Sequence, residues 1–188
     1  MKIISVTLRT SLLLMVLVLA YQLAVTGIAQ AIAPDKANGS IIYNRDGQAV
    51  GSSLIGQSFT SPTFFQGRVS SIDYNAASSG TPNYSPSNTD MLTRTSDSIT
   101  KWKVDNPEVP ISNLPIDLIS NSGSGLDPHI SPDAALIQIP RISELTGIAK
   151  EQLEKLVDEH TEGPDWGLFG DKRVNVLQLN IALSEMNK

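Results

Sequence analysis

The 188-residue sequence contains no cysteine and only two histidines, His129 and His160. The absence of cysteine excludes disulfide frameworks, thiol nucleophiles and thiolate metal sites together. Two imidazoles without HExxH spacing do not indicate a catalytic zinc site, because carboxylates in no recognisable pattern would have to supply the remaining ligands. The sequence also lacks a GxxxxGK(S/T) phosphate loop. We therefore expect no metal, and no cofactor held by this chain.

Runs of basic residues are lacking as well. The formal net charge of the chain is -5. Nucleic-acid binding needs clustered Lys and Arg to contact phosphates, so no nucleic-acid partner is expected. The length and the 40% hydrophobic fraction fit one domain of ordinary size together with a targeting or anchoring segment.

Charged side chains are absent from Thr10 to Pro34. A helix rises about 1.5 Å per residue, so this apolar stretch is long enough to cross the roughly 30 Å hydrocarbon core of a bilayer. It predicts a transmembrane helix over residues 10–33. Lys2 and Arg9 precede it, so residues 1–9 are expected in the cytoplasm and residues 34–188 outside it. The sequence thus predicts a single-pass protein of the cell (inner or plasma) membrane with an extracytoplasmic domain.

A cleavable signal peptide is the alternative interpretation of the same stretch. Residues 29–31 and 31–33 both fit the small-residue pattern that precedes signal-peptidase cleavage. The apolar run exceeds the usual core of about 7 to 15 residues in such peptides, which favours a retained anchor. Either outcome exports the rest of the chain.

Two stripes on the predicted membrane helix suggest contacts with other helices. Small residues recur at helical spacing and would let a neighbouring helix approach closely. A second stripe is polar, and amides facing lipid would be unfavourable. The alternative is that small residues are common in spanning helices and that the glutamines lie near an interface. The first stripe is Ala20, Ala24, Gly27 and Ala31, and the second is Gln22, Thr26 and Gln30.

Turn residues and hydrophobic spacing predict a mixed α+β domain beyond the span. Short apolar runs flank an expected turn at residues 45–47, which indicates two strands. Residues 60–87 are rich in Ser, Pro, Gly and Asn and predict a long surface loop, which favours a function or an interface there. A helix is expected from near Asn88, with Leu92, Ile99 and Trp102 on one face. Pro115 is expected to introduce a strand at residues 116–120.

Three further helices are predicted in the C-terminal third. Ser131 followed by Pro132 is a strong helix start. The serine hydroxyl can accept hydrogen bonds from the free amides of the first turn, and proline has no amide hydrogen that would need a partner there. This helix is expected to bury Leu136, Ile139 and Ile142 and to kink at Pro140. The second follows Gly147 with core residues Leu153, Leu156 and Val157; the third is capped by Asn175, with core residues Val176, Leu179 and Leu183.

The segment SGSGLDPHISPDAA, residues 122–135, places Ser124, Asp127 and His129 close together in sequence. A nucleophile elbow needs Gly-x-Ser-x-Gly, and the leading glycine is missing here. A catalytic triad needs each side chain aimed at the next, which residues this close, separated by a proline, seldom achieve. We interpret the segment as a bend, and these three residues together with Arg68 as a docking surface for a partner.

These motifs, in this order behind one N-terminal span, resemble the C subunit of the bacterial Kdp potassium-transporting P-type ATPase. The resemblance covers essentially the whole chain. It departs from the family pattern at Val69, where the family often has proline, and at residues 78–83. It rests on ANGS (37–40), GSSLIGQSF (51–59), FFQGR (64–68), SGSGLDPHISPDAA (122–135), QIPRI (138–142) and RVNVLQLNIAL (173–183).

The resemblance implies a non-catalytic accessory subunit. Its implied partners are a potassium-selective, channel-like subunit and an ATP-hydrolysing subunit, in addition to the lipid membrane. It also implies a catalytic chaperone that stabilises the complex and raises its affinity for ATP. ATP is thus implicated at the level of the complex, and Gln57 has a partial likeness to a signature glutamine that contacts nucleotide.

The predicted topology conflicts with a direct ATP contact, because Gln57 would face the compartment that lacks ATP. A coupling through membrane contacts is the interpretation we favour. Two other function classes stay open from the residues alone. One is an anchored extracytoplasmic binding module unrelated to a pump, and the other is an exported serine hydrolase with Ser124 as its nucleophile.

Overall fold

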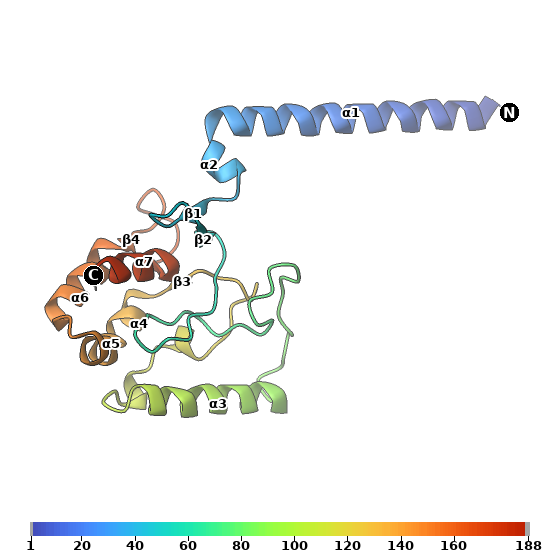
Figure 1. Ribbon diagram of the computed structural model, residues 1–188. Coiled ribbons are helices and arrows are strands. Elements are labelled where there is room, and N and C mark those ends of the chain that lie inside the picture. The colour runs from blue at the N-terminus through green and yellow to red at the C-terminus, as the bar shows by residue number, and fades with distance from the viewer. Residues whose placement is uncertain (1, 187–188) are drawn as a thin grey trace. The chain divides into compact units, whose positions relative to one another are not determined.

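The computed structural model describes residues 2–186, and its contacts divide the chain into two units that meet between Val50 and Gly51 (Figure 1). The first unit contains helices α1 and α2 and strand β1, and strand β2 crosses into the second unit. The elements are α1 (Lys2–Ile32), α2 (Pro34–Ala37), β1 (Ile41–Tyr43), β2 (Ala49–Ser52), α3 (Thr89–Asp105), η1 (Ile111–Asn113), η2 (Ile116–Leu118), β3 (His129–Ile130), α4 (Pro132–Leu136), α5 (Ile139–Thr146), α6 (Lys150–Glu159), β4 (Thr161–Glu162), β5 (Arg173–Asn175) and α7 (Val176–Met186).

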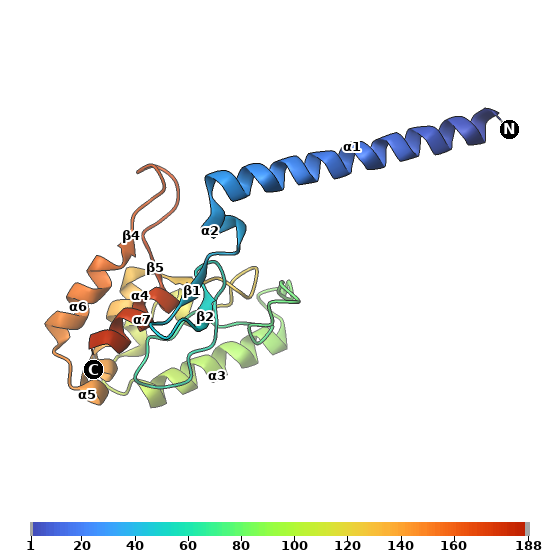
Figure 2. The same cartoon turned by 45° about the horizontal axis from the view of Figure 1, so that its top comes forward.

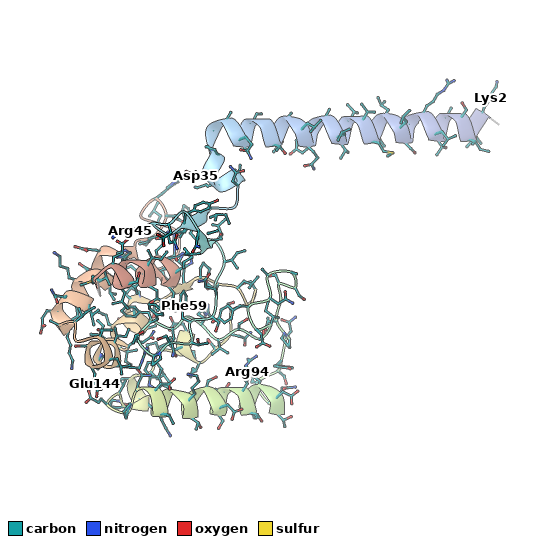
Figure 3. All side chains as sticks on the ribbon, viewed as in Figure 1. Lys2, Asp35, Arg45, Phe59, Arg94 and Glu144 are labelled. Atoms are coloured by element: carbon teal, nitrogen blue, oxygen red, sulfur yellow. The ribbon has the colours of Figure 1, made fainter. Side chains whose placement is uncertain are left out.

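Helix α1 confirms the predicted N-terminal apolar helix. It runs for 31 residues, and none of its side chains is buried in the protein (Figure 3). Among residues 2–186 it is the one helix that is long and apolar enough to cross a membrane. A helix that is apolar over most of its surface is stable beside lipid or other helices, because in water its apolar side chains would be exposed.

The predicted strand pair around residues 45–47 is confirmed. Strands β1 and β2 form a two-stranded sheet. The side-chain oxygen of Asn44 accepts hydrogen bonds from the backbone amides of Asp46, at 3.0 Å, and Gln48, at 2.9 Å. Gly47 has a φ of 73°, in the left-handed region that glycine adopts at little cost. Asparagine and glycine together thus fix the turn.

The second unit is built around an antiparallel three-stranded sheet with the strand order β3-β5-β4. Ile130 and Thr161 both face Val174 of the central strand. Helices α4 and α7 pack against β5, and α6 packs against both of these helices. The predicted α+β class is therefore confirmed.

Three predicted helix starts are confirmed by their capping bonds. Asn88 accepts from the amides of Asp90 and Met91 at the start of α3. The Ser131 hydroxyl accepts from the Ala134 amide, and the Asn175 side chain accepts from Gln178. The predicted long loop is also confirmed, since residues 60–87 hold no helix or strand and only one bridge, from Val69 to Asn121.

Two predicted elements were wrong. Residues 116–120 do not form a strand, because the chain closes on itself: the Leu118 amide donates to the Pro115 carbonyl, and that of Ile119 to Ile116, which makes the short helix η2. The helix expected to kink at Pro140 is two helices, α4 and α5. Pro140 lies in the first turn of α5, where its missing donor costs nothing.

Two residues expected in the core lie at the surface. Leu92 is 53% exposed and Leu136 is 40% exposed. The other predicted core residues of the four helices are buried or half-buried, which includes Trp102, Ile142 and Leu179. The core also contains Phe65, which comes from the long loop and has no exposed surface. The loop is therefore anchored in the domain through its FFQGR segment.

Candidate docking groove

Two buried side-chain amides hold the FFQGR segment in place. Asn180 of α7 accepts from the Phe65 amide at 2.8 Å and donates to the Phe65 carbonyl at 2.9 Å. Gln138 does the same for Gln66, accepting at 2.8 Å and donating at 3.1 Å. Each amide thus replaces the hydrogen bonds that a neighbouring strand would supply. Three of the segments that carried the family resemblance meet here.

Arg141 fixes the other end of the same segment. Its guanidinium donates to the side-chain oxygen of Asn106 at 3.0 Å, to that of Gln138 at 2.9 Å, and to the carbonyl oxygens of Pro62 and Phe64. Burial lowers the pKa of Arg141, because the charged form loses hydration. These bonds tie the segment that leads to Arg68 to the core of the domain.

Residues 122–129 form the bend that the sequence predicted. The Ser124 hydroxyl accepts from the Leu126 amide at 3.0 Å, and the side chain of Asp127 accepts from the His129 amide at 3.0 Å. The Ser70 hydroxyl ties the bend to the long loop by donating to the Gly125 carbonyl at 2.7 Å. Ser124 therefore stabilises a turn, and its hydroxyl is not paired with an imidazole.

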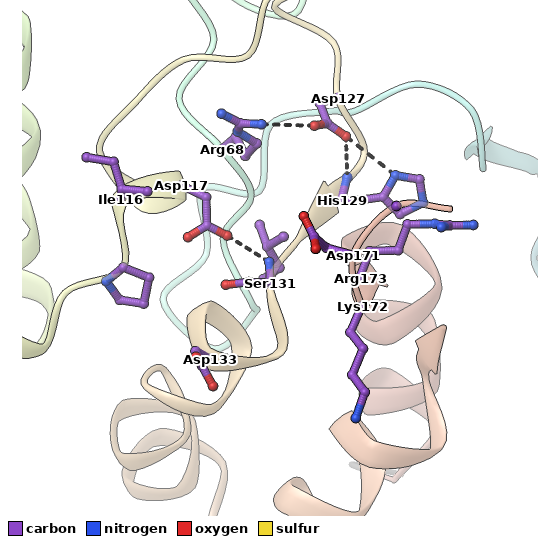
Figure 4. A pocket seen from close by; sticks show the side chains of 13 residues that line it. Arg68, Ile116, Asp117, Asp127, His129, Ser131, Asp133, Asp171, Lys172 and Arg173 are labelled. Carbon is purple, nitrogen blue, oxygen red and sulfur yellow. Dashed lines mark hydrogen bonds and ion pairs between the residues drawn. The ribbon is translucent and has the colours of Figure 1, made fainter. Parts of the chain in front are cut away.

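Arg68, Asp127 and His129 meet at one groove (Figure 4). Arg68 donates to one carboxylate oxygen of Asp127 at 3.1 Å, and His129 Nδ1 lies 3.4 Å from the other. The structure thus brings together three of the four predicted docking residues, and Ser124 lies in the adjoining turn. The groove has a volume of about 550 Å³ and is lined by Arg68, Pro115, Ile116, Asp117, Asp127, His129, Ile130, Ser131, Asp133, Gly170, Asp171, Lys172 and Arg173.

Sequence reasoning missed the far wall of the groove. Asp117 of η2 accepts from the Ser131 amide at 2.7 Å, which joins two segments that were not expected to meet. Asp171, Lys172 and Arg173 come from the chain that leads into β5. Both acidic and basic side chains line the groove, which suits a polar protein surface better than one small charged ligand. Among residues 2–186, no group of three or more His, Cys, Asp or Glu side chains is placed to hold a metal ion.

The carboxyl group of Asp127 is the charged centre of the groove. Burial by itself would raise its pKa, but hydrogen bonds from the side chain and backbone of His129 and from Arg68 outweigh that effect. The net result is a pKa below the ordinary value of 3.8. The folded protein therefore favours the carboxylate.

This lowered pKa predicts a pH-dependent contribution to stability. A carboxyl group with a lower pKa in the folded state stabilises the fold above its unfolded-state value, and the contribution is lost as the pH falls through the folded-state pKa. We expect Asp127→Asn to lower the thermal midpoint at pH 7, and the difference from wild type to shrink as the pH falls below 3.8. Asp158→Asn, on the exposed face of α6, is the control. A difference between wild type and Asp127→Asn that persists unchanged at pH 3 would contradict this.

Gln57 lies at the junction of β2 and the long loop. Its side chain packs against Gly51, where a methyl group would overlap it. Gln57 also lines a hollow of only about 10 Å³, together with Gly67, Tyr74 and Val176. Such a hollow has room for about one water molecule.

The seven residues of the two membrane stripes all lie exposed on α1. Gln30 of the polar stripe donates to the side chain of Asn38 at 3.1 Å. The proposed contacts of Ala20, Ala24, Gly27, Ala31, Gln22 and Thr26 with neighbouring helices stay predictions.

Comparison with known proteins adds a family likeness over almost the whole chain. Residues 3–185 match the family model described as KdpC: K+-transporting ATPase, c chain. A relative from Bacillus cereus, named potassium-transporting ATPase KdpC subunit, is 58% identical over 170 residues, which cover 90% of this chain and 88% of the relative. Relatives with the same name from Bacillus anthracis and Bacillus thuringiensis are 56% identical over the same lengths.

Proposed function

Because the chain belongs to the KdpC family of K+-transporting ATPase subunits, we propose that it is a non-catalytic accessory subunit that stabilises the pump and raises its affinity for ATP. The hydrolytic site then lies on another subunit. The partners we propose are the potassium-selective, channel-like subunit and the ATP-hydrolysing subunit, with α1 held in the membrane beside them.

This proposal rests on the positions, in the fold, of three segments that carry the family resemblance. FFQGR, QIPRI and RVNVLQLNIAL form a hydrogen-bonded scaffold through Gln138, Arg141 and Asn180. That scaffold lies beside an open polar groove around Arg68, and the nearby Ser124 hydroxyl accepts a hydrogen bond from the Leu126 amide. Such a surface supports the proposal of an accessory subunit, since it offers polar contacts to a partner.

We propose that the second unit lies outside the cytoplasm, because Lys2 and Arg9 of α1 precede the stretch of that helix that has no charged side chain. This places Gln57 away from ATP. The packing of Gln57 against Gly51 and its small hollow support a structural role. The effect on ATP affinity is then a coupling free energy transmitted through contacts between subunits.

The proposal predicts the ATP dependence of the assembled pump. We expect the complex with this chain to have a KM for ATP at least about fivefold lower than the complex without it, the low end of typical allosteric coupling. The measurement is potassium-stimulated ATP hydrolysis in detergent or nanodiscs. Equal KM values with and without the chain would contradict the chaperone role, and failure to co-purify with the other subunits would favour an unrelated binding module.

A direct nucleotide contact is tested separately on the purified chain. We expect no saturable ATP binding at micromolar concentrations, and no change in the KM of the pump with Gln57→Ala beyond what a loss of stability explains. The matched control is Gln48→Ala in the exposed turn between β1 and β2. Saturable micromolar binding that is lost in Gln57→Ala alone would overturn the indirect mechanism.

A further inference from the structure

The loop between β4 and β5 displays three large apolar side chains to solvent. Trp166 is 92% exposed, Leu168 is 80% exposed and Phe169 is 64% exposed. The loop projects from the body of the second unit (Figure 2). The other tryptophan, Trp102, is only 6% exposed. Three adjacent apolar side chains in water are unfavourable by themselves, and such patches mark interaction sites.

Hydrogen bonds and ion pairs hold this loop in one conformation. The Asp165 amide donates to the Phe169 carbonyl at 2.8 Å, and the Phe169 amide donates back at 3.0 Å. The Arg173 guanidinium lies 3.1 Å from carboxylate oxygens of both Glu162 and Asp165. The hydrogen bond to Asp165 is the main cause that raises the pKa of Arg173. The three apolar side chains are therefore presented by a preorganised hairpin tip.

The backbone of the tip adopts a conformation that a non-glycine residue rarely takes. Trp166 has a φ of 55°, in the left-handed region. The bridge from Asp165 to Phe169 closes the turn around this residue and keeps it there. Strain of this kind is retained only where the surroundings fix it, and it clusters at binding sites.

The tip continues directly into the groove described above. Gly170, Asp171, Lys172 and Arg173 follow Phe169 and line one wall of that groove. The apolar tip is thus linked directly, through residues 170–173, to the polar groove around Arg68. Interfaces between proteins have this composition, with aromatic anchors beside polar contacts.

We propose that Trp166, Leu168 and Phe169 anchor the second unit to another subunit of the pump, in an apolar pocket rimmed by basic side chains. Tryptophan is among the residues that contribute most to binding when they are buried in an interface. The acidic residues Glu162, Asp165 and Asp171 flank the tip. They outnumber the two basic residues of the same segment, Lys172 and Arg173, of which Arg173 is already paired with Glu162 and Asp165. The remaining negative charge complements a basic rim and disfavours an anionic bilayer surface. This inference rests on the proposed function, because the partner is a subunit of the same ATPase.

Tryptophan fluorescence tests the burial of the tip directly, because the full chain has one exposed and one buried tryptophan. In wild type alone, in proteoliposomes, we expect acrylamide to quench the Trp166 emission and lipids with brominated acyl chains to leave it unchanged. The other subunits are then produced with a non-fluorescent tryptophan analogue, so that only this chain emits. On assembly with them, the fraction of the emission that acrylamide can quench should disappear. Trp166→Phe should show no such change. Trp166 that stays accessible in the complex, or that brominated lipids quench in the chain alone, would overturn the proposal.

A triple variant, W166S with L168S and F169S, tests the energetic role of the tip. We expect its yield of assembled complex to fall at least about tenfold at limiting concentrations, with an unchanged thermal midpoint for the chain alone, because the side chains are exposed. The control is V104S with L145S, which removes two exposed apolar side chains elsewhere on the domain. If wild type assembles and the triple variant matches it, the anchor is wrong and the proposed function stands. If wild type itself does not assemble, both fail.

Discussion

Replacement of Arg141 by methionine is expected to lower the free energy of unfolding by about 3–5 kcal/mol. Methionine fills a similar volume, so the loss comes from the polar groups that remain. The carbonyl oxygens of Pro62 and Phe64 and the side-chain oxygen of Asn106 would lose a charged donor, at about 1–3 kcal/mol for each acceptor that water cannot reach.

The measurement is denaturant-induced unfolding of the full chain in detergent, followed by tryptophan fluorescence, in which the buried Trp102 reports the loss of the core. Lys155→Met is the matched control, because the Lys155 side chain is 77% exposed and pairs with Glu159 on the same helix. We expect that control to change stability by less than about 1 kcal/mol. A similar, small effect for both variants would show that Arg141 does not hold the long loop against the core.

The Arg141 network also shows why part of this fold could not be predicted from sequence. The helix caps at Asn88, Ser131 and Asn175 could be predicted, because a cap and the amides that it satisfies lie within three residues of each other. Asn180 and Phe65 are 115 residues apart and leave no local pattern. Polar pairs at such separations depend on the completed fold.

The two wrong elements have local physical causes. Residues 116–120 have strand-like composition, but the amides after Pro115 find acceptors three residues back and no neighbouring strand. Pro140 was expected to kink one helix, and the chain instead ends that helix before it and starts another. In both cases the local propensity of the residues was read correctly. The final structure was decided by packing partners whose positions the sequence does not give.

Only some of the residues that line the candidate groove could be predicted from the sequence. Arg68, Asp127 and His129 lie in the segments that carried the family resemblance, so they were identified and the structure brings them together. Lys172 and Arg173 reach the groove through the pairing of β3 with β5, which the sequence did not reveal. The hairpin tip was missed because WGLF has neither helical nor strand periodicity.

Gly56, in the GSSLIGQSF segment, lies against the bend of residues 122–129. We expect Gly56→Ala to be strongly destabilising. A methyl group there would lie 2.5 Å from the Asp127 carbonyl oxygen and 3.0 Å from its carbonyl carbon. These are backbone atoms, so no side chain can rotate to relieve the contact. The Gly56 amide also donates to the Leu126 carbonyl at 2.7 Å, a bond that would stretch as the two segments separate.

We expect Gly56→Ala to lower the free energy of unfolding by about 2–4 kcal/mol, the sum of an overpacked contact and one weakened hydrogen bond. Gly123→Ala is the matched control within the same bend, since a methyl group there meets nothing within 4 Å. That variant should be neutral or slightly stabilising, because alanine restricts the unfolded chain. Equal thermal midpoints for the two variants would contradict the close approach. The displaced Asp127 in Gly56→Ala should also weaken its ion pair with Arg68, so assembly with the pump should decrease along with stability.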